Sequence, residues 1–120
     1  MLTDAQITRL LDVANAGCHK GMVTQARTVY AGVLAVRPGH VPALIGQALS
    51  HIVISEFDQA EEQLKAILAG NADDFDAQAL LGLCLFLADK KDEAREVLEP
   101  LQSREGSSAA LVASLLEQLD

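Results

Sequence analysis

The chain has 120 residues, half of them apolar, and a formal net charge of −8. This length predicts one domain with enough apolar material for a core. The longest apolar run, residues 79–88, is too short to cross a bilayer, so we expect no membrane insertion. After residue 40 the chain has fifteen acidic and five basic side chains, and this negative net charge would repel a nucleic-acid backbone. We therefore expect no nucleic-acid partner.

Capping and turn residues divide the chain into seven predicted helices. Thr3 can cap the first, and Gln6 completes a capping box. Pro42 suits the first turn of the third helix, and Pro100 is expected to kink or shorten the sixth. The predicted helices cover residues 4–16, 23–36, 42–54, 58–69, from an Asp73 or Asp74 cap to 88, 92–102, and from a Ser107 or Ser108 cap to 119.

Four sets of three residues recur with a spacing of 34. Two sets are small and two are large and apolar, which predicts close helix contacts at the small positions and a filled core at the large ones. Three in-phase copies of four columns are not expected by chance. The columns are Ala14, Ala48 and Gly82; Ala26, Ala60 and Ala94; Tyr30, Leu64 and Leu98; and Val33, Ile67 and Leu101.

This period and pattern resemble the tetratricopeptide repeat (TPR), a helical hairpin that stacks into a solenoid. Pro38 matches the proline that often closes the unit, whereas Leu10, Leu44 and Gln78 replace its early large aromatic residue. The resemblance implies an all-α fold, a right-handed α-solenoid of three TPR hairpins plus a C-terminal capping helix. The expected organisation is a single domain, 1–120, with repeats 7–40, 41–74 and 75–108 and a capping helix 109–120.

By the same resemblance, the first helix of each hairpin lines a concave groove. Segments 44–54 and 80–88 are apolar around almost the whole helix, more than one hairpin partner is expected to bury. We expect a helix or an extended apolar segment of another polypeptide to cover this groove. The alternatives are that the terminal helix covers the groove, or that a second copy of the chain covers it in a homodimer. The predicted groove residues are Leu11, Ile45, Leu49, Ile52, Val53, Leu83, Phe86 and Leu87.

The length, acidity and apolar groove resemble those of the small TPR chaperones of bacterial type III secretion, which keep their cargo subunits unassembled. A generic TPR adaptor, scaffold or self-associating repeat protein is the alternative. Co-chaperones that grip a terminal carboxylate need polar or basic groups in the groove. Although Asn15 matches one such position, Leu11, Leu49, Ala79 and Leu83 occupy others, which argues against that mode.

No catalytic or metal site is predicted, and we expect neither enzymatic activity nor a cofactor. Cys18 and His19 are sequence neighbours and would point about 100° apart on a helix. His51 could approach Cys84, but the sequence shows no carboxylate placed to orient either one. A metal site using His40 and His51 is disfavoured because His40 lies in a turn. The two cysteines show no close pairing pattern, which favours a reduced, cytoplasmic setting.

Overall fold

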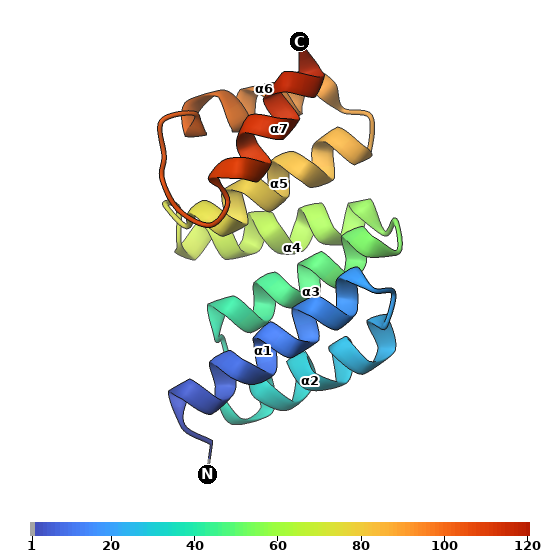
Figure 1. The fold of residues 1–120 in the computed structure, drawn as a ribbon, viewed down its shortest axis with the longest axis vertical. Coiled ribbons are helices and arrows are strands. Elements are labelled where there is room, and N and C mark those ends of the chain that lie inside the picture. Colours follow the sequence, from blue (N-terminus) through green and yellow to red (C-terminus); the bar gives the residue numbers. More distant parts are fainter. Residues whose placement is uncertain (1) are drawn as a thin grey trace. The chain divides into compact units, whose positions relative to one another are not determined.

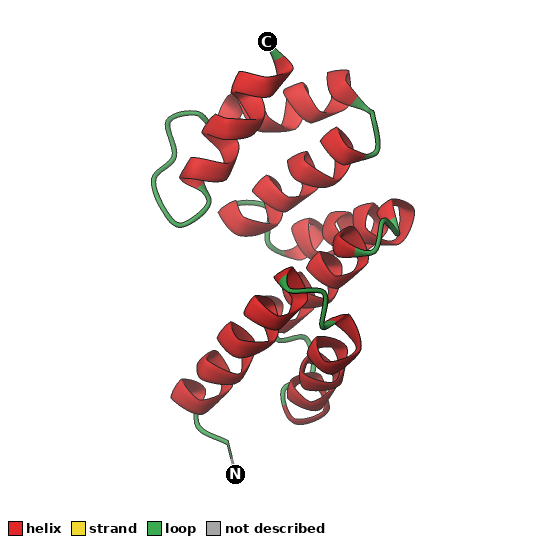
Figure 2. Cartoon of the chain, turned by 45° about the vertical axis from the view of Figure 1, so that its right-hand side comes forward, coloured by secondary structure: helices red, strands yellow, loops and turns green. Residues whose placement is uncertain are grey.

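The computed structural model describes residues 2–120, and within this range it contains α-helices, one 3₁₀ helix and no strand (Figures 1 and 2). The all-helical prediction is confirmed. The helices are α1 (Asp4–His19), α2 (Val23–Val36), α3 (Val41–Val53), α4 (Phe57–Gly70), α5 (Phe75–Leu87), α6 (Lys91–Leu98), η1 (Glu99–Leu101) and α7 (Ala109–Leu119).

The chain divides into two compact units, the first ending at Glu56 and the second beginning at Phe57. In the first unit α1, α2 and α3 all contact one another, and Figure 1 shows α3 alongside the α1–α2 hairpin. In the second unit α5 contacts α4, α6 and α7. A helix with three neighbours needs apolar residues on more than one side. This explains why segment 80–88 is apolar almost all round, and a single 1–120 domain stays a prediction.

The residues of all four 34-residue columns are buried. Their packing follows the predicted logic where the contacts are close. A methyl group on Gly82 of α5 would overlap the side chain of Leu98 of α6, so the small position does allow the two helices to approach. A methyl group on Gly46 of α3 would likewise overlap the ring of Tyr30 on α2, so this glycine allows α3 and α2 to approach. The repeat register is therefore the register of the core.

Several predicted helix ends are confirmed. The capping box of Thr3 and Gln6 is present, and the Asp74 side chain accepts from the backbone N–H of Ala77. α6 ends at Leu98, and the stretch containing Pro100 continues as η1, because proline cannot supply the helical N–H bond.

One helix end and one cap differ clearly from the prediction, while the other ends agree within one residue apart from the shortened α6. α1 continues to His19 rather than stopping at Ala16, because Gly21, with φ of 83°, makes the left-handed turn instead of Gly17. Ser108 lies at the N-cap of α7 but its side chain does not cap the helix. Its hydroxyl donates instead to Asp76 of α5 at 2.6 Å, which ties the start of α7 to α5.

The terminal helix covers the last hairpin, as expected for a cap. α7 contacts α5, α6 and η1, and it buries Val112, Leu115, Leu116 and Leu119. No helix between residues 2 and 120 has both the length and the apolar character needed to cross a membrane.

Candidate functional site

In the first unit, the predicted groove residues differ in how much surface they retain. Leu11, Leu49 and Ile52 are buried, with exposed fractions of 5%, 7% and 5%. Ile45 is half-buried, and Val53, the last residue of α3, is 36% exposed. In this conformation a partner can reach Val53 and part of Ile45, while the three buried side chains offer it little surface.

In the second unit, the three predicted groove residues on α5 all remain at least partly accessible. Leu83 and Phe86 are half-buried, and Leu87 is 46% exposed. Their i, i+3, i+4 spacing places them on one face of the helix. The capping helix α7 therefore leaves an apolar stripe on α5 uncovered.

Val53 and Leu87 are separated by one repeat length, so they occupy the same position in successive repeats. Each is the last residue of its helix, α3 or α5. Both are exposed, unlike the four columns that form the core. The first repeat has His19 at this position. Each unit thus leaves an apolar side chain exposed at the end of a helix: Val53 in the first unit, and Leu87, next to Leu83 and Phe86, in the second.

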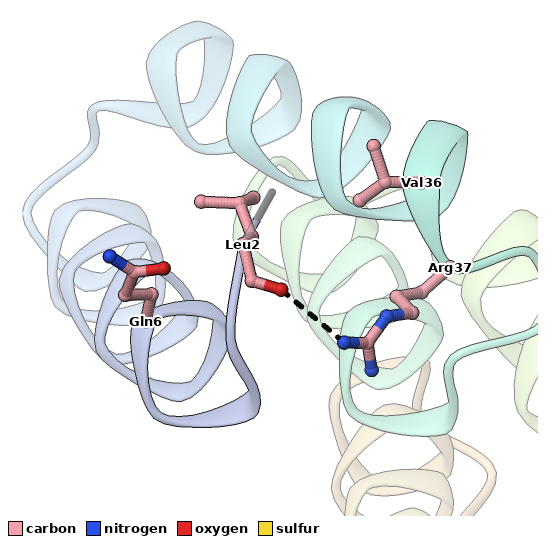
Figure 3. Close-up of a pocket in the computed structure, with 4 residues that line it drawn as sticks. All are labelled: Leu2, Gln6, Val36 and Arg37. Atoms are coloured by element: carbon pink, nitrogen blue, oxygen red, sulfur yellow. Dashed lines mark hydrogen bonds between the residues drawn. The ribbon is translucent and has the colours of Figure 1, made fainter.

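Two surface hollows on the first unit adjoin at Leu2, and the sequence prediction included neither. The larger, about 650 Å³, lies between the start of α1 and the end of α2 (Figure 3). Beside it Arg37 donates to the backbone oxygen of Leu2 and pairs with Asp4 at 2.7 Å. The smaller, about 330 Å³, runs along α1. The first is lined by Leu2, Gln6, Val36 and Arg37, and the second by Leu2, Gln6, Arg9, Leu10 and Val13.

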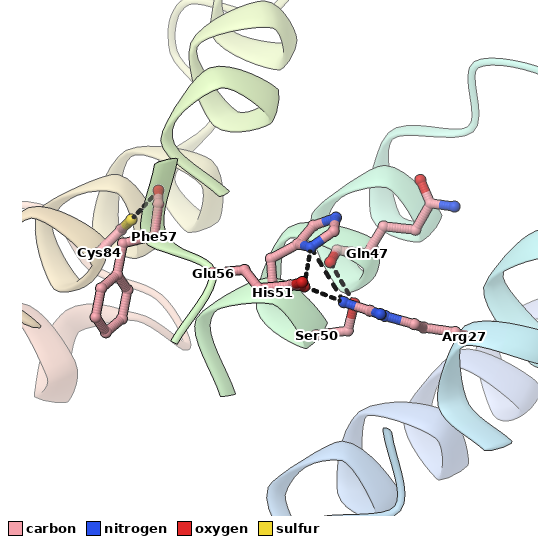
Figure 4. Close-up of polar contacts among 7 residues, drawn as sticks. All are labelled: Arg27, Gln47, Ser50, His51, Glu56, Phe57 and Cys84. Atoms are coloured by element: carbon pink, nitrogen blue, oxygen red, sulfur yellow. Dashed lines mark hydrogen bonds and ion pairs between the residues drawn. The ribbon is translucent and has the colours of Figure 1, made fainter. Parts of the chain in front are cut away.

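A polar cluster fixes the end of α3 against α2. The Arg27 guanidinium donates to Ser50 Oγ at 3.0 Å and to Glu56 Oε1 at 2.8 Å, and the same Glu56 oxygen lies 2.8 Å from His51 Nδ1 (Figure 4). The hydrogen bonds from Arg27 and His51 lower the pKa of Glu56. The cluster holds the chain directly after Val53 in place.

This cluster corrects the expectation that His51 has no orienting carboxylate, since Glu56 provides one. The combination of serine, histidine and glutamate nevertheless does not form a hydrolytic site. Ser50 is fully buried, and its hydroxyl donates to the backbone oxygen of Gln47 at 2.6 Å. A nucleophile must reach its substrate and be activated by the base, and Ser50 does not meet the first condition.

Burial also makes the two thiols poor nucleophiles. It raises the pKa of Cys18 and of Cys84, so both remain protonated at neutral pH. Cys84 Sγ lies 3.3 Å from the backbone oxygen of Phe57 and donates to it. Within residues 2–120, no group of three or more histidine, cysteine or carboxylate side chains is arranged to hold a metal ion.

Helical hairpins that recur at a spacing of 34 residues and bury the same positions in each repeat define the class of helical-repeat interaction scaffolds. Family comparison gives the same class a more specific identity. The tetratricopeptide repeat model matches residues 19–83 and 55–119, which together cover most of the chain. The chain belongs to the tetratricopeptide repeat family.

Among curated relatives, tetratricopeptide repeat protein 21B of Homo sapiens and of Mus musculus are each 31% identical to the chain over 87 residues. The match covers 68% of this chain but only 7% of either relative. The chain thus corresponds to a small part of those proteins, and their whole-protein roles do not transfer to it.

Two solved structures share the fold. The Sgt2 TPR domain from Aspergillus fumigatus has a TM-score of 0.76 at 20% identity, covering 95% of this chain and 76% of that one. A tetratricopeptide repeat protein from Parabacteroides merdae has a TM-score of 0.66 at 16% identity, covering 98% and 46%. At these identities the likeness concerns the fold alone.

Proposed function

We propose that this chain is a polypeptide-binding adaptor that uses the apolar stripe of Leu83, Phe86 and Leu87 on α5 and, in the first unit, the exposed side chain of Val53 at the position equivalent to Leu87. The observation that carries the proposal is that α7 leaves this stripe accessible, with Leu87 46% exposed and Leu83 and Phe86 half-buried. Family membership supports the general role, since TPR domains bind other polypeptides.

The chemistry of the stripe defines the kind of partner. Apolar side chains at i, i+3 and i+4 complement an amphipathic helix or an extended apolar segment. Full burial of one such side chain contributes about 1.5–3 kcal/mol, and a half-buried one contributes correspondingly less. A few exposed apolar residues therefore support moderate affinity, which suits an adaptor that releases its partner.

A chaperone role in type III secretion is the more specific form of this proposal. It rests on the chain's length, acidity and apolar groove residues. The relatives named above have no secretion-related description, so this form has no support from them, and the generic adaptor fits the findings better. A cytoplasmic location would suit either role.

Comparing the proteins that co-purify with three baits tests which surface of the chain binds the partner. The baits are the wild-type chain, the double variant Val53→Gln and Leu87→Gln, and the control Met22→Gln. Glutamine is chosen because Val53 and Leu87 end their helices, where an added negative charge would be unfavourable. Met22 is 47% exposed and is not one of the predicted groove positions.

The adaptor proposal predicts a protein that co-purifies with the wild-type chain and the Met22 control but not with the double variant. A protein that is retained equally by all three baits would refute this contact surface. If size-exclusion chromatography shows a dimer that only the double variant converts to a monomer, the surface mediates self-association instead.

A further inference from the structure

The side of α1 that carries Val13 has the register of a helix-packing surface. In α3 the corresponding side faces the preceding helix, because Ser50 accepts from Arg27 of α2. In α5 it faces α4, because Cys84 donates to the backbone oxygen of Phe57, the first residue of α4. Ser50 and Cys84 are one repeat length apart, and Ala16 occupies the same position in α1.

Apart from Gln47 of α3, which is half-buried, the side chains at these positions are buried in α3 and α5. Those of α1 are exposed. Ala43 and Ala77 are fully buried, whereas Arg9 at the same position is exposed. Leu81 is 7% exposed, whereas its α1 equivalent, Val13, is 71% exposed. The two hollows at Leu2 lie on this side of α1 and extend to Val36 of α2. We define the outer face as Leu2, Leu10, Val13 and Val36, with Arg9 and Arg37 at its rim.

We infer that the outer face docks an amphipathic helix of another polypeptide, one with an apolar stripe flanked by carboxylates. The apolar centre follows from Val13 at 71%, Val36 at 56% and Leu10 at 38% exposure. The carboxylates follow from Arg9, whose position is fully buried beneath a helix in the other two repeats. A covered arginine requires a negatively charged partner, and the docked helix would supply it.

Charge also disfavours a second copy of the same face as the occupant. The residues that line the two hollows include the cations Arg9 and Arg37 and no carboxylate. The nearby Asp4 is already paired with Arg37. A symmetric contact between two outer faces would therefore bring the cationic residues that line the hollows together, which is unfavourable. None of the outer-face residues is among those of the adaptor proposal, so this inference goes beyond it.

The chain itself supplies a probe of the right chemistry. α4 covers the equivalent side of α5 and has an apolar stripe of Ala60, Leu64 and Ile67 with the carboxylates Asp58, Glu61 and Glu62. The probe is a fluorescein-labelled peptide of residues 57–70. Because so short a helix is marginal in water, a hydrocarbon staple joins the exposed positions 65 and 69. The control peptide carries lysine in place of the three carboxylates.

Fluorescence anisotropy measures the binding of the labelled peptides to the full chain and to its variants. The inference predicts that the acidic peptide binds the wild-type chain, that Val13→Asp weakens binding by about tenfold or more, and that Leu87→Gln changes it by less than about twofold. Arg9→Glu should weaken the acidic peptide and strengthen the lysine peptide. Circular dichroism melting should be unchanged for Val13→Asp, since that side chain is 71% exposed.

Three results would overturn the inference. The first is no binding of the acidic peptide to the wild-type chain up to about 1 mM, which is weaker than useful recognition. The second is equal binding to wild type and Val13→Asp, which would place the peptide elsewhere, including in exchange with α4 on α5. The third is loss of binding in Leu87→Gln alone, which would assign the peptide to the adaptor surface and leave the outer face without a ligand.

Discussion

The replacement Gly46→Ala tests whether α3 packs on α2 as described. The added methyl group would lie within 3.0 Å of three ring atoms of Tyr30. The ring cannot easily move aside, because Tyr30 is fully buried and its hydroxyl donates to Asn15 Oδ1. Overpacking of this kind costs about 1–3 kcal/mol of unfolding free energy. Replacing glycine by alanine inside a helix contributes about 1 kcal/mol in the opposite direction.

Gly32→Ala is the matched control, because it separates these two effects. Gly32 lies within α2, and a methyl group added there would meet no other atom within 4 Å. Both variants gain the same helix propensity, so urea unfolding followed by the circular dichroism of the helices should show Gly46→Ala less stable than Gly32→Ala by about 1–3 kcal/mol. Adding Tyr30→Leu should remove most of the difference, since it removes the ring that overlaps the methyl group.

Two results would refute this packing. If Gly46→Ala is as stable as Gly32→Ala, the Tyr30 ring does not lie against α3. If the difference persists in the Tyr30→Leu background, the strain at Gly46 comes from another neighbour.

Two further predictions concern the core and the polar cluster. Ala60→Leu should lower the unfolding free energy by about 1–3 kcal/mol, because Ala60 is fully buried, while Ala66→Leu at an exposed position of α4 should be close to neutral; equal urea midpoints would contradict the register. Arg27 and His51 lower the pKa of Glu56 in the folded state, so the stability it contributes is present at neutral pH and is lost as the pH falls through the folded pKa. The difference in stability between wild type and Glu56→Gln should therefore shrink as the pH is lowered from neutral to about 3.5, and a constant difference would contradict the cluster.

The sequence was sufficient to predict the repeat register because the register depends on residue size at fixed spacing. Ala60, Leu64 and Ile67 recur in phase with their counterparts, and all are buried. Local capping was predictable because Thr3 and Gln6 are only three residues apart in the sequence and form hydrogen bonds with each other. The prediction was less accurate for Ser108, because its partner Asp76 is 32 residues away.

The surfaces were less predictable than the core. The resemblance to the tetratricopeptide repeat assigned Leu49 and Ile52 to a groove. The exposed fraction of a side chain depends, however, on how closely neighbouring helices approach, and both residues are buried. The salt bridge between Arg27 and Glu56 could not be predicted, because it joins residues 29 positions apart that belong to no sequence motif. Val13 is one apolar residue among many in the sequence, and only its exposure, set against that of Leu81, distinguishes it.

The most direct test of the adaptor surface is a calorimetric titration of the purified partner, once co-purification has identified it, into the double variant Val53→Gln and Leu87→Gln. Because both side chains are exposed, the variant should melt like the wild type. The adaptor proposal predicts that its affinity for the partner falls by about tenfold or more, while Met22→Gln binds like the wild type. An unchanged affinity in a folded double variant would contradict the proposal.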